Sequence, residues 1–158
     1  MLSTPGLTVR VIACCIVGTA IAHTAIAATP DDACSFLSPA QVSAALGVSV
    51  GAGTYVTPAF KKTCTWSATT SGGGTVTLNL QGLELYESGK KTASYGRISA
   101  TPVSGIGDDA YYLGTDKLAS LIVKKGSVAF KVAVYAHVPV EKQQAAERVL
   151  AMQVAPQL

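Results

Sequence analysis

The sequence is poor in the residues from which catalytic and metal sites are usually built. It has two histidines and four cysteines among 158 residues. It contains no G-x-S-x-G motif, which presents the nucleophilic serine of many hydrolases, and no loop with the ligand spacing of an EF-hand. Most familiar classes of hydrolase and metalloenzyme therefore have no support in the sequence. We expect no catalytic residue, no metal and no cofactor.

Charged residues are also scarce and are weakly biased toward positive charge. They make up 13% of the chain, the net charge is +3, and aromatic residues account for only 6%. A nucleic-acid-binding surface needs more positive charge, interleaved with aromatic side chains. The sequence therefore predicts no nucleic-acid partner. The lysines instead form separated doublets typical of solvated turns: Lys61-Lys62, Lys90-Lys91 and Lys124-Lys125.

The first 27 residues have the organisation of an export signal. Arg10 precedes an apolar run over residues 11–22, and an A-x-A site ends at Ala27. A basic start, an apolar centre and small residues before the cleavage point define a signal peptide. We therefore expect residues 1–27 to be cleaved and residues 28–158 to form a single domain, which is enough chain to bury one core. The predicted location is periplasmic or secreted.

Two alternatives exist for this segment. A membrane anchor needs about 20 consecutive apolar residues, whereas this run is shorter and contains Gly18 and Thr19. The uncleaved signal is the only contact with a membrane that the sequence predicts. Residues 11–14 also resemble a bacterial lipobox ending at Cys14, but Arg10 leaves little apolar sequence before it. Cleavage after Ala27 is the preferred interpretation, and lipidation at Cys14 stays open.

Signal removal leaves two cysteines, Cys34 and Cys64. In an exported chain, two cysteines are typical of one disulfide bond. A metal site would need more ligands, and the single histidine left, His137, is remote in sequence from both cysteines. A disulfide that closes a loop of about 30 residues stabilises a small domain by roughly 3–4 kcal/mol in the chain-entropy model.

Helix signals lie near both ends of the predicted domain. Ser38 and Gln41 have the spacing of an S-x-x-Q capping box, with Pro39 at the first helical position. This predicts a short helix over 39–46 that ends at Gly47, where a left-handed residue is favoured. A second helix is predicted after Pro139. Its apolar positions recur at helical spacing: Ala146, Val149, Leu150 and Val154.

The segment between the two helices is dominated by strand patterns. Residues 75–81 alternate strictly, with Val76, Leu78 and Leu80 on one face, which predicts a half-buried strand of an antiparallel sheet. Further strands are expected over 63–68, 110–113, 118–124 and 127–136, joined mostly by tight turns. Residues 48–57 are a strand or an extended loop, 83–98 suit a helix broken at Gly89 and Gly96, and 101–109 are a turn cluster. The predicted fold is α+β, with a sheet of about five to six strands and both terminal helices on one face.

Candidate ligand-binding residues are few. Residues 105–110 fit G-x-G-x-x-A, but a strand follows where a dinucleotide site needs a helix. Asp108 and Asp109 therefore suit a turn, with calcium or acid–base chemistry as alternatives. Trp66 is expected to pack over the disulfide, and Tyr111 and Tyr112 face opposite sides of a strand, so one is expected to be exposed. The candidates are Trp66, Asp108, Asp109, Tyr111 and Tyr112.

Three ordered motifs carry a family resemblance. They are C-x-x-L-[ST] leading to Leu46-Gly47, C-x-W at 64–66, and G-I-G-D-x-A-Y at 105–111. In this order they resemble a family of small exported bacterial domains of unknown function, many of which are lipoproteins. The resemblance implies a twisted antiparallel sheet in an α+β domain, a disulfide between the two motif cysteines and no established catalytic residues. This chain departs from the family in its weak lipobox.

These observations lead to one preferred function and two alternatives. The preferred function is an exported, non-enzymatic envelope domain that binds an unidentified envelope protein or a small ligand. The first alternative is a periplasmic immunity or inhibitor protein directed against a secreted toxin or enzyme. The second is a hydrolase that uses Asp108, Asp109 and His137, which requires these side chains to lie within hydrogen-bonding reach of one site.

Overall fold

One antiparallel sheet organises the computed structural model, which describes residues 31–93 and 97–158. Its strands are β1 (Thr54–Thr57), β2 (Phe60–Ser67), β3 (Thr75–Gln81), β4 (Ser99–Val103), β5 (Asp109–Gly114), β6 (Ala119–Lys125) and β7 (Val128–Tyr135). Their order across the sheet is β1-β2-β3-β7-β6-β5-β4. The predicted α+β fold is confirmed, with seven strands in place of the expected five to six. The predicted signal over 1–27, with Cys14, lies outside the described residues.

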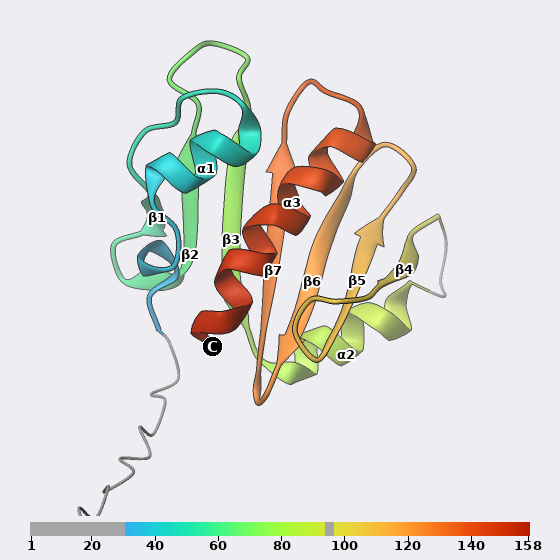
Figure 1. Ribbon diagram of the computed structural model, residues 1–158. Coiled ribbons are helices and arrows are strands. Elements are labelled where there is room, and N and C mark those ends of the chain that lie inside the picture. The colour runs from blue at the N-terminus through green and yellow to red at the C-terminus, as the bar shows by residue number, and fades with distance from the viewer. Residues whose placement is uncertain (1–30, 94–96) are drawn as a thin grey trace, which may run out of the picture.

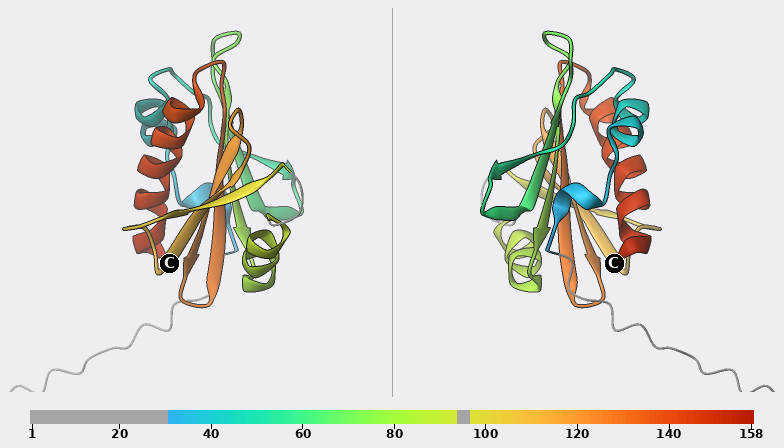
Figure 2. Two further views of the ribbon diagram at one scale, coloured as in Figure 1. Left: turned by 90° about the vertical axis from the view of Figure 1, so that its right-hand side faces the viewer. Right: turned by 90° about the vertical axis from the view of Figure 1, so that its left-hand side faces the viewer.

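Helices cover both faces of this sheet (Figure 1). Helix α1 (Pro39–Leu46) and helix α3 (Val140–Val154) lie on one face, as predicted, and α2 (Leu83–Thr92) lies on the other (Figure 2). Helix α2 continues through Gly89, where the sequence predicted a break. An added Cβ at Gly89 would collide with the Tyr111 hydroxyl, so the glycine allows α2 to approach the sheet closely. Within residues 31–93 and 97–158, none of the helices combines the length and apolar character that a membrane span requires.

The boundaries of α1 follow from its capping residues. The Ser38 hydroxyl accepts a hydrogen bond from the Gln41 amide at 3.3 Å, and the Gln41 side chain accepts one from the Ser38 amide at 2.8 Å. These two bonds form the predicted capping box. The helix ends at Gly47, whose φ of 72° lies in the left-handed region. The N-terminal helix is therefore confirmed in position and length.

The additional strands lie at the two edges of the sheet. Strand β4 occupies residues that the sequence assigned partly to a turn cluster, because Pro102 and the neighbouring glycines suggested a loop. Pro102 is compatible with this edge strand because β4 pairs only with β5 and leaves its other side unpaired. Strand β1, at the opposite edge, forms the C-terminal end of the segment 48–57, which the sequence left open between a strand and an extended loop.

The core on the α1–α3 face is joined to the N-terminus by the predicted disulfide. Cys34 and Cys64 form the bond, and Cys64 and Trp66 are fully buried beside each other on β2. Gly53 lies so close that an added Cβ would be 2.6 Å from the Cys64 Sγ and 2.8 Å from the Trp66 Nε1. The apolar face predicted for β3 points into this core together with alternate residues of β7. Trp66 therefore packs by the disulfide, as expected.

Loss of the disulfide should weaken this core because it frees a loop with a sequence separation of 30 residues. We expect Cys34→Ser to lower the free energy of unfolding by about 3–4 kcal/mol, measured by urea denaturation. Reduction of the unaltered protein should give a similar shift. The double variant C34S/C64S is the control, because reductant should leave its midpoint unchanged. Equal midpoints for the oxidised and reduced protein would contradict the prediction.

Candidate functional site

The two aspartates singled out from the sequence hold neighbouring parts of the fold together. The Asp108 carboxylate accepts hydrogen bonds from the Gly126 amide at 2.7 Å and from Lys125 Nζ at 3.2 Å. Asp109 forms an ion pair with Lys90 of α2. The Gly126 amide, followed by Lys125, lowers the pKa of Asp108, and Lys90 is the main cause of a lowered pKa at Asp109. Both side chains line a cavity of about 500 Å³ along residues 102–109, but their carboxylates already have partners.

The glycines of the same motif are required by backbone geometry. Gly107 has a φ of 59°, and an added Cβ would collide with the Lys124 carbonyl oxygen. Ile106, beside it, is buried in the main core. The motif G-I-G-D therefore fixes the approach of β5 to the β6–β7 hairpin, which is a structural explanation for its residues.

Tyr111 and Tyr112 lie on opposite faces of β5, as predicted, and both hydroxyls have partners. Tyr111 is buried, donates a hydrogen bond to the Tyr86 carbonyl at 2.7 Å, and makes an edge-to-face contact with the Tyr86 ring. Tyr112 is half-buried and donates to the Gln144 carbonyl of α3 at 2.8 Å. Burial raises the pKa of Tyr112 to about 12. Neither side chain is exposed, so the prediction that one of them would be is wrong. These tyrosines join the sheet to α2 and α3, and neither presents a free hydroxyl to a ligand.

His137 lies at the opposite end of the sheet from the aspartates. Asp109 is in register with Lys124 of β6, which is in register with Ala129 near the start of β7. His137 follows the end of β7, eight residues after Ala129. At about 3.3 Å per residue, His137 lies roughly 25 Å along the strand direction from Ala129. Because Asp109 is level with Ala129 across the sheet, His137 is at least that far from Asp109. The structure therefore does not bring together the residues that the hydrolase alternative requires.

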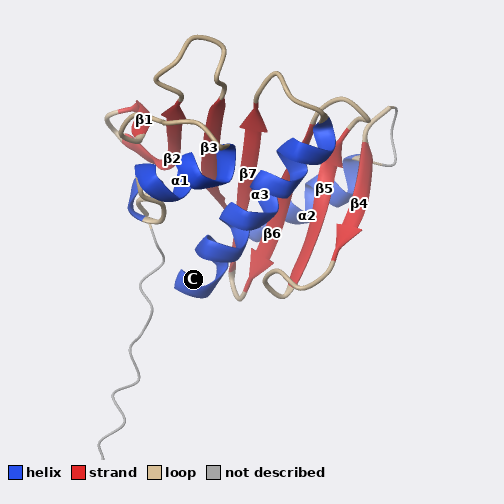
Figure 3. Cartoon of the chain, turned by 45° about the horizontal axis from the view of Figure 1, so that its top comes forward, coloured by secondary structure: helices blue, strands red, loops and turns tan. Residues whose placement is uncertain are grey.

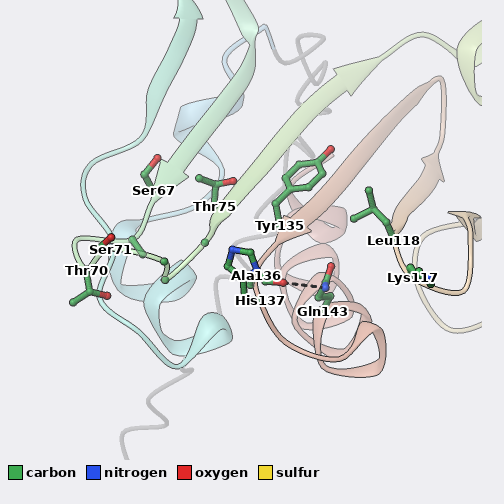
Figure 4. Close-up of a pocket in the computed structure, with 14 residues that line it drawn as sticks. Ser67, Thr70, Ser71, Thr75, Lys117, Leu118, Tyr135, Ala136, His137 and Gln143 are labelled. Carbon is green, nitrogen blue, oxygen red and sulfur yellow. Dashed lines mark hydrogen bonds between the residues drawn. The ribbon is translucent and has the colours of Figure 1, made fainter.

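The end of the sheet near His137 contains a cavity of about 610 Å³. Its walls come from the β2–β3 turn, the β5–β6 turn, the end of β7 and the first turn of α3, which meet at this end of the molecule (Figure 3). Figure 4 shows the polar side chains around it, among them Tyr135, which is 45% exposed. The lining groups that can form hydrogen bonds through their side chains are Ser67, Thr70, Ser71, Thr75, Lys117, Tyr135, His137 and Gln143.

Gln143 is the buried polar residue of this cavity, with 6% of its surface exposed. Its amide nitrogen donates to the carbonyl oxygens of Ala136 at 3.1 Å and Val138 at 2.9 Å. These bonds determine the orientation of the amide, and in Figure 4 its oxygen points toward the space between Tyr135 and Leu118. That buried oxygen has no hydrogen-bond partner within the described residues. An acceptor buried without a partner costs about 1–3 kcal/mol, so it indicates where a donor would be favourable.

A second cavity, of about 540 Å³, lies between α1 and α3. It shares one wall with the first, formed by Gly72, Gly73, Ala136 and His137. The rest of its lining is mainly alanine, valine and leucine from the C-terminal half of α1 and the first half of α3. We call this second cavity the α1–α3 groove.

Glu147 lies one turn after Gln143 on α3 and is fully buried. Its Oε1 accepts a hydrogen bond from the Val134 amide at 2.9 Å, beyond Leu121 and Val132, the last pair in register between β6 and β7. The carboxyl group thus serves as the acceptor where β6 no longer pairs. Burial raises the pKa of Glu147 to about 8, although the amides of Val134 and Leu121 oppose this shift. The side chain is therefore mostly neutral at pH 7.

Neither Gln143 nor Glu147 was identified from the sequence. The apolar pattern predicted Val149 on the buried face of the last helix, but Val149 is 47% exposed. Ala146, Leu150 and Val154 are buried as predicted, and Gln143 and Glu147 lie on the same buried face. The spacing of four, three and four residues from Gln143 through Glu147 and Leu150 to Val154 is the only signal that could have placed two polar side chains on that face.

Neither similarity to known proteins nor a metal site assigns a function to the described residues. No family model, curated protein or solved structure matches the chain. The resemblance carried by the three sequence motifs therefore stays a prediction. Among the described residues, no group of three or more His, Cys, Asp or Glu side chains is arranged to hold a metal ion.

The structural role of Gly107 can be tested against a matched glycine. Gly107 and Gly126 have similar positive φ values of 59° and 57°, but only Gly107 would bring an added Cβ against backbone. Gly126→Ala should cost about 1 kcal/mol through backbone strain, and Gly107→Ala should cost clearly more because a collision is added. Urea denaturation of both variants measures the difference. Equal destabilisation would contradict the close packing assigned to Gly107.

Glu147 should make stability fall as the pH rises. The unfolded chain releases this proton near pH 4.5 and the folded protein near pH 8. As the pH rises between these two values, the free energy of unfolding therefore falls, by roughly 4–5 kcal/mol in total. Relative to the unaltered protein, Glu147→Gln should gain stability between pH 5 and pH 8.5, measured by urea denaturation across this range.

Glu141→Gln is the control for this measurement because Glu141 is exposed in the first turn of the same helix. It should leave the slope of stability against pH unchanged. A Glu147→Gln variant with the same slope as the unaltered protein would show that Glu147 ionises normally in the folded state.

Proposed function

We propose that this protein is an exported, non-enzymatic domain of the bacterial envelope that binds a small ligand in the cavity at the end of its sheet. The observation that carries the proposal is the buried Gln143 amide oxygen, oriented toward the cavity and without a partner. Nearly all buried polar groups in proteins have a partner. Four buried side-chain atoms of the described residues have none, and the Gln143 oxygen is the one whose residue lines this cavity, so a bound ligand can supply its partner. The ligand should carry a hydrogen-bond donor, because only a donor satisfies this oxygen.

The other groups of the cavity suit the same class of ligand. Its walls present several hydroxyl groups and one exposed aromatic ring, that of Tyr135. A cavity of several hundred Å³ with a few convergent polar groups is typical of small-molecule sites. Because the Gln143 side chain is buried, the group that reaches its oxygen must enter the cavity between the other lining residues, among them Leu118 and Tyr135.

The lining also favours binding over catalysis. Among the described residues, no carboxylate lines the cavity, and no side chain hydrogen-bonds to the His137 imidazole. Nucleophilic catalysis needs a base that is held by an orienting group within hydrogen-bonding reach of a nucleophile. The residues around His137 supply hydroxyl groups but no such orienting acid.

Export is part of the proposal and is supported by two observations. Residues 1–27 have the organisation of a signal peptide, and the Cys34–Cys64 disulfide is compatible with an oxidising compartment outside the cytoplasm. Periplasmic and secreted locations both fit. The immunity or inhibitor interpretation stays a prediction, since no surface of the described residues favours it specifically.

Ligand binding at the sheet end can be mapped by NMR with a set of monosaccharides and polyols. Shifts should cluster on the Gln143 side-chain amide and on residues 70–75, 117–118 and 135–137. Tyr135→Ala should weaken binding about tenfold by removing the exposed ring, worth roughly 1–1.5 kcal/mol. Leu85→Ala, at an exposed position on α2, is the matched control. Shifts that cluster on residues 102–109, or are absent for every compound, would contradict the proposal.

A further inference from the structure

The α1–α3 groove is an apolar surface that the sheet-end cavity does not explain. Val138 and Val149 line it and are 42% and 47% exposed. Met152, one turn after Val149 on α3, is 53% exposed and extends the apolar surface along the helix. Isolated exposed apolar residues are ordinary, but a contiguous apolar surface in a concave site marks a binding surface.

The apolar lining and the charges of the groove restrict what it can bind. Its walls carry small apolar side chains, Ala44 and Ala45 from α1 and Ala145 and Ala146 from α3. The two ionisable residues that line it, Lys142 and His137, are both bases, and no carboxylate lines it within the described residues. Both lie at or before the start of α3, so the positive charge of Lys142 lies at one end of the groove.

We propose that the α1–α3 groove binds a single acyl chain whose anionic head group lies beside Lys142 and His137. The cavity of about 540 Å³, with mainly alanine, valine and leucine walls, suits one hydrocarbon chain, and the Lys142 ammonium at one end suits one negative head group. This site does not depend on the function proposed for the sheet-end cavity, although the two share the wall that contains His137.

Fatty acids of increasing length test the proposal directly. The purified, disulfide-bonded protein is titrated with octanoate, decanoate and dodecanoate below their micelle-forming concentrations, with affinity measured by calorimetry. Each added methylene should strengthen binding about twofold to fourfold, up to ~0.8 kcal/mol. Decyltrimethylammonium, which has a similar chain and a cationic head, should bind at least tenfold more weakly than decanoate. Affinity independent of chain length, or equal affinity for the two head groups, would overturn the proposal.

Two variants separate the chain from the head group. Val149→Ser should weaken dodecanoate binding about tenfold, and Lys142→Glu should remove the preference for the anionic head. Val56→Ser, at a position 66% exposed on β1, is the control and should bind as the unaltered protein does. Equal binding by Val149→Ser and the control would overturn the proposal. So would concentration-dependent dimerisation that competes with dodecanoate, because it would identify a second copy as the occupant.

NMR distinguishes this proposal from the one made for the sheet-end cavity. Dodecanoate should shift the resonances of residues 44–48 and 142–149, whereas the saccharides and polyols should shift those of 70–75 and 117–118. Shifts from dodecanoate at 70–75 and 117–118 alone would overturn the acyl site and leave the sheet-end site in place. Dodecanoate shifts in the groove, with none from the saccharides and polyols, would support the acyl site and contradict the sheet-end site.

Discussion

The hydrogen bond from the Val134 amide to the buried Glu147 carboxyl joins α3 to the sheet where β6 and β7 stop pairing. One turn earlier on the same helix, the Gln143 amide holds the carbonyl oxygens of Ala136 and Val138. Together these two side chains bind α3 to the last residue pairs of β7 and to the loop that follows. Both cavities have walls in this region, so their shapes depend on the same few hydrogen bonds.

Buried polar groups of this kind are costly, which limits the explanations for them. An apolar side chain would fill the same space between α3 and the sheet without the cost of removing a carboxyl group from water. The neutral form of Glu147 reduces that cost and still offers an oxygen to Val134. Gln143 satisfies two backbone carbonyls but leaves its own oxygen unpartnered. Among the four buried side-chain atoms without a partner in the described residues, only the Gln143 oxygen belongs to a residue that lines the sheet-end cavity, where we place a ligand.

The parts of the fold that local sequence patterns specify were predicted well. The capping box at Ser38 and Gln41, the alternation of β3 and the two cysteines outside the predicted signal each depend on neighbouring residues or on simple counting. The predicted helices, the sheet and the disulfide followed from them. Strand β4 was placed partly in a turn because residues 101–109 are rich in proline, glycine and aspartate, and only the topology shows that it lies at an edge.

The candidate site was harder to predict because it depends on contacts between distant segments. Asp108 was considered for ligand binding because carboxylates in glycine-rich loops often bind ions, but the structure places the Gly126 amide against it. Gln143 and Glu147 look like solvent-exposed residues of an amphipathic helix. Their burial follows from the rotation of α3 about its axis, which the apolar pattern alone set incorrectly at Val149.

The central claim is that a buried, mostly neutral Glu147 holds α3 against the end of β7. Its most direct test is the titration of the Glu147 side-chain carboxyl carbon by NMR in the folded protein between pH 4 and pH 10. We expect an apparent pKa near 8, accompanied by a shift of the Val134 amide proton at the same pH. A pKa near the ordinary value of 4.5, with no change at Val134, would show that the carboxyl group is exposed to water and that α3 is held by other contacts.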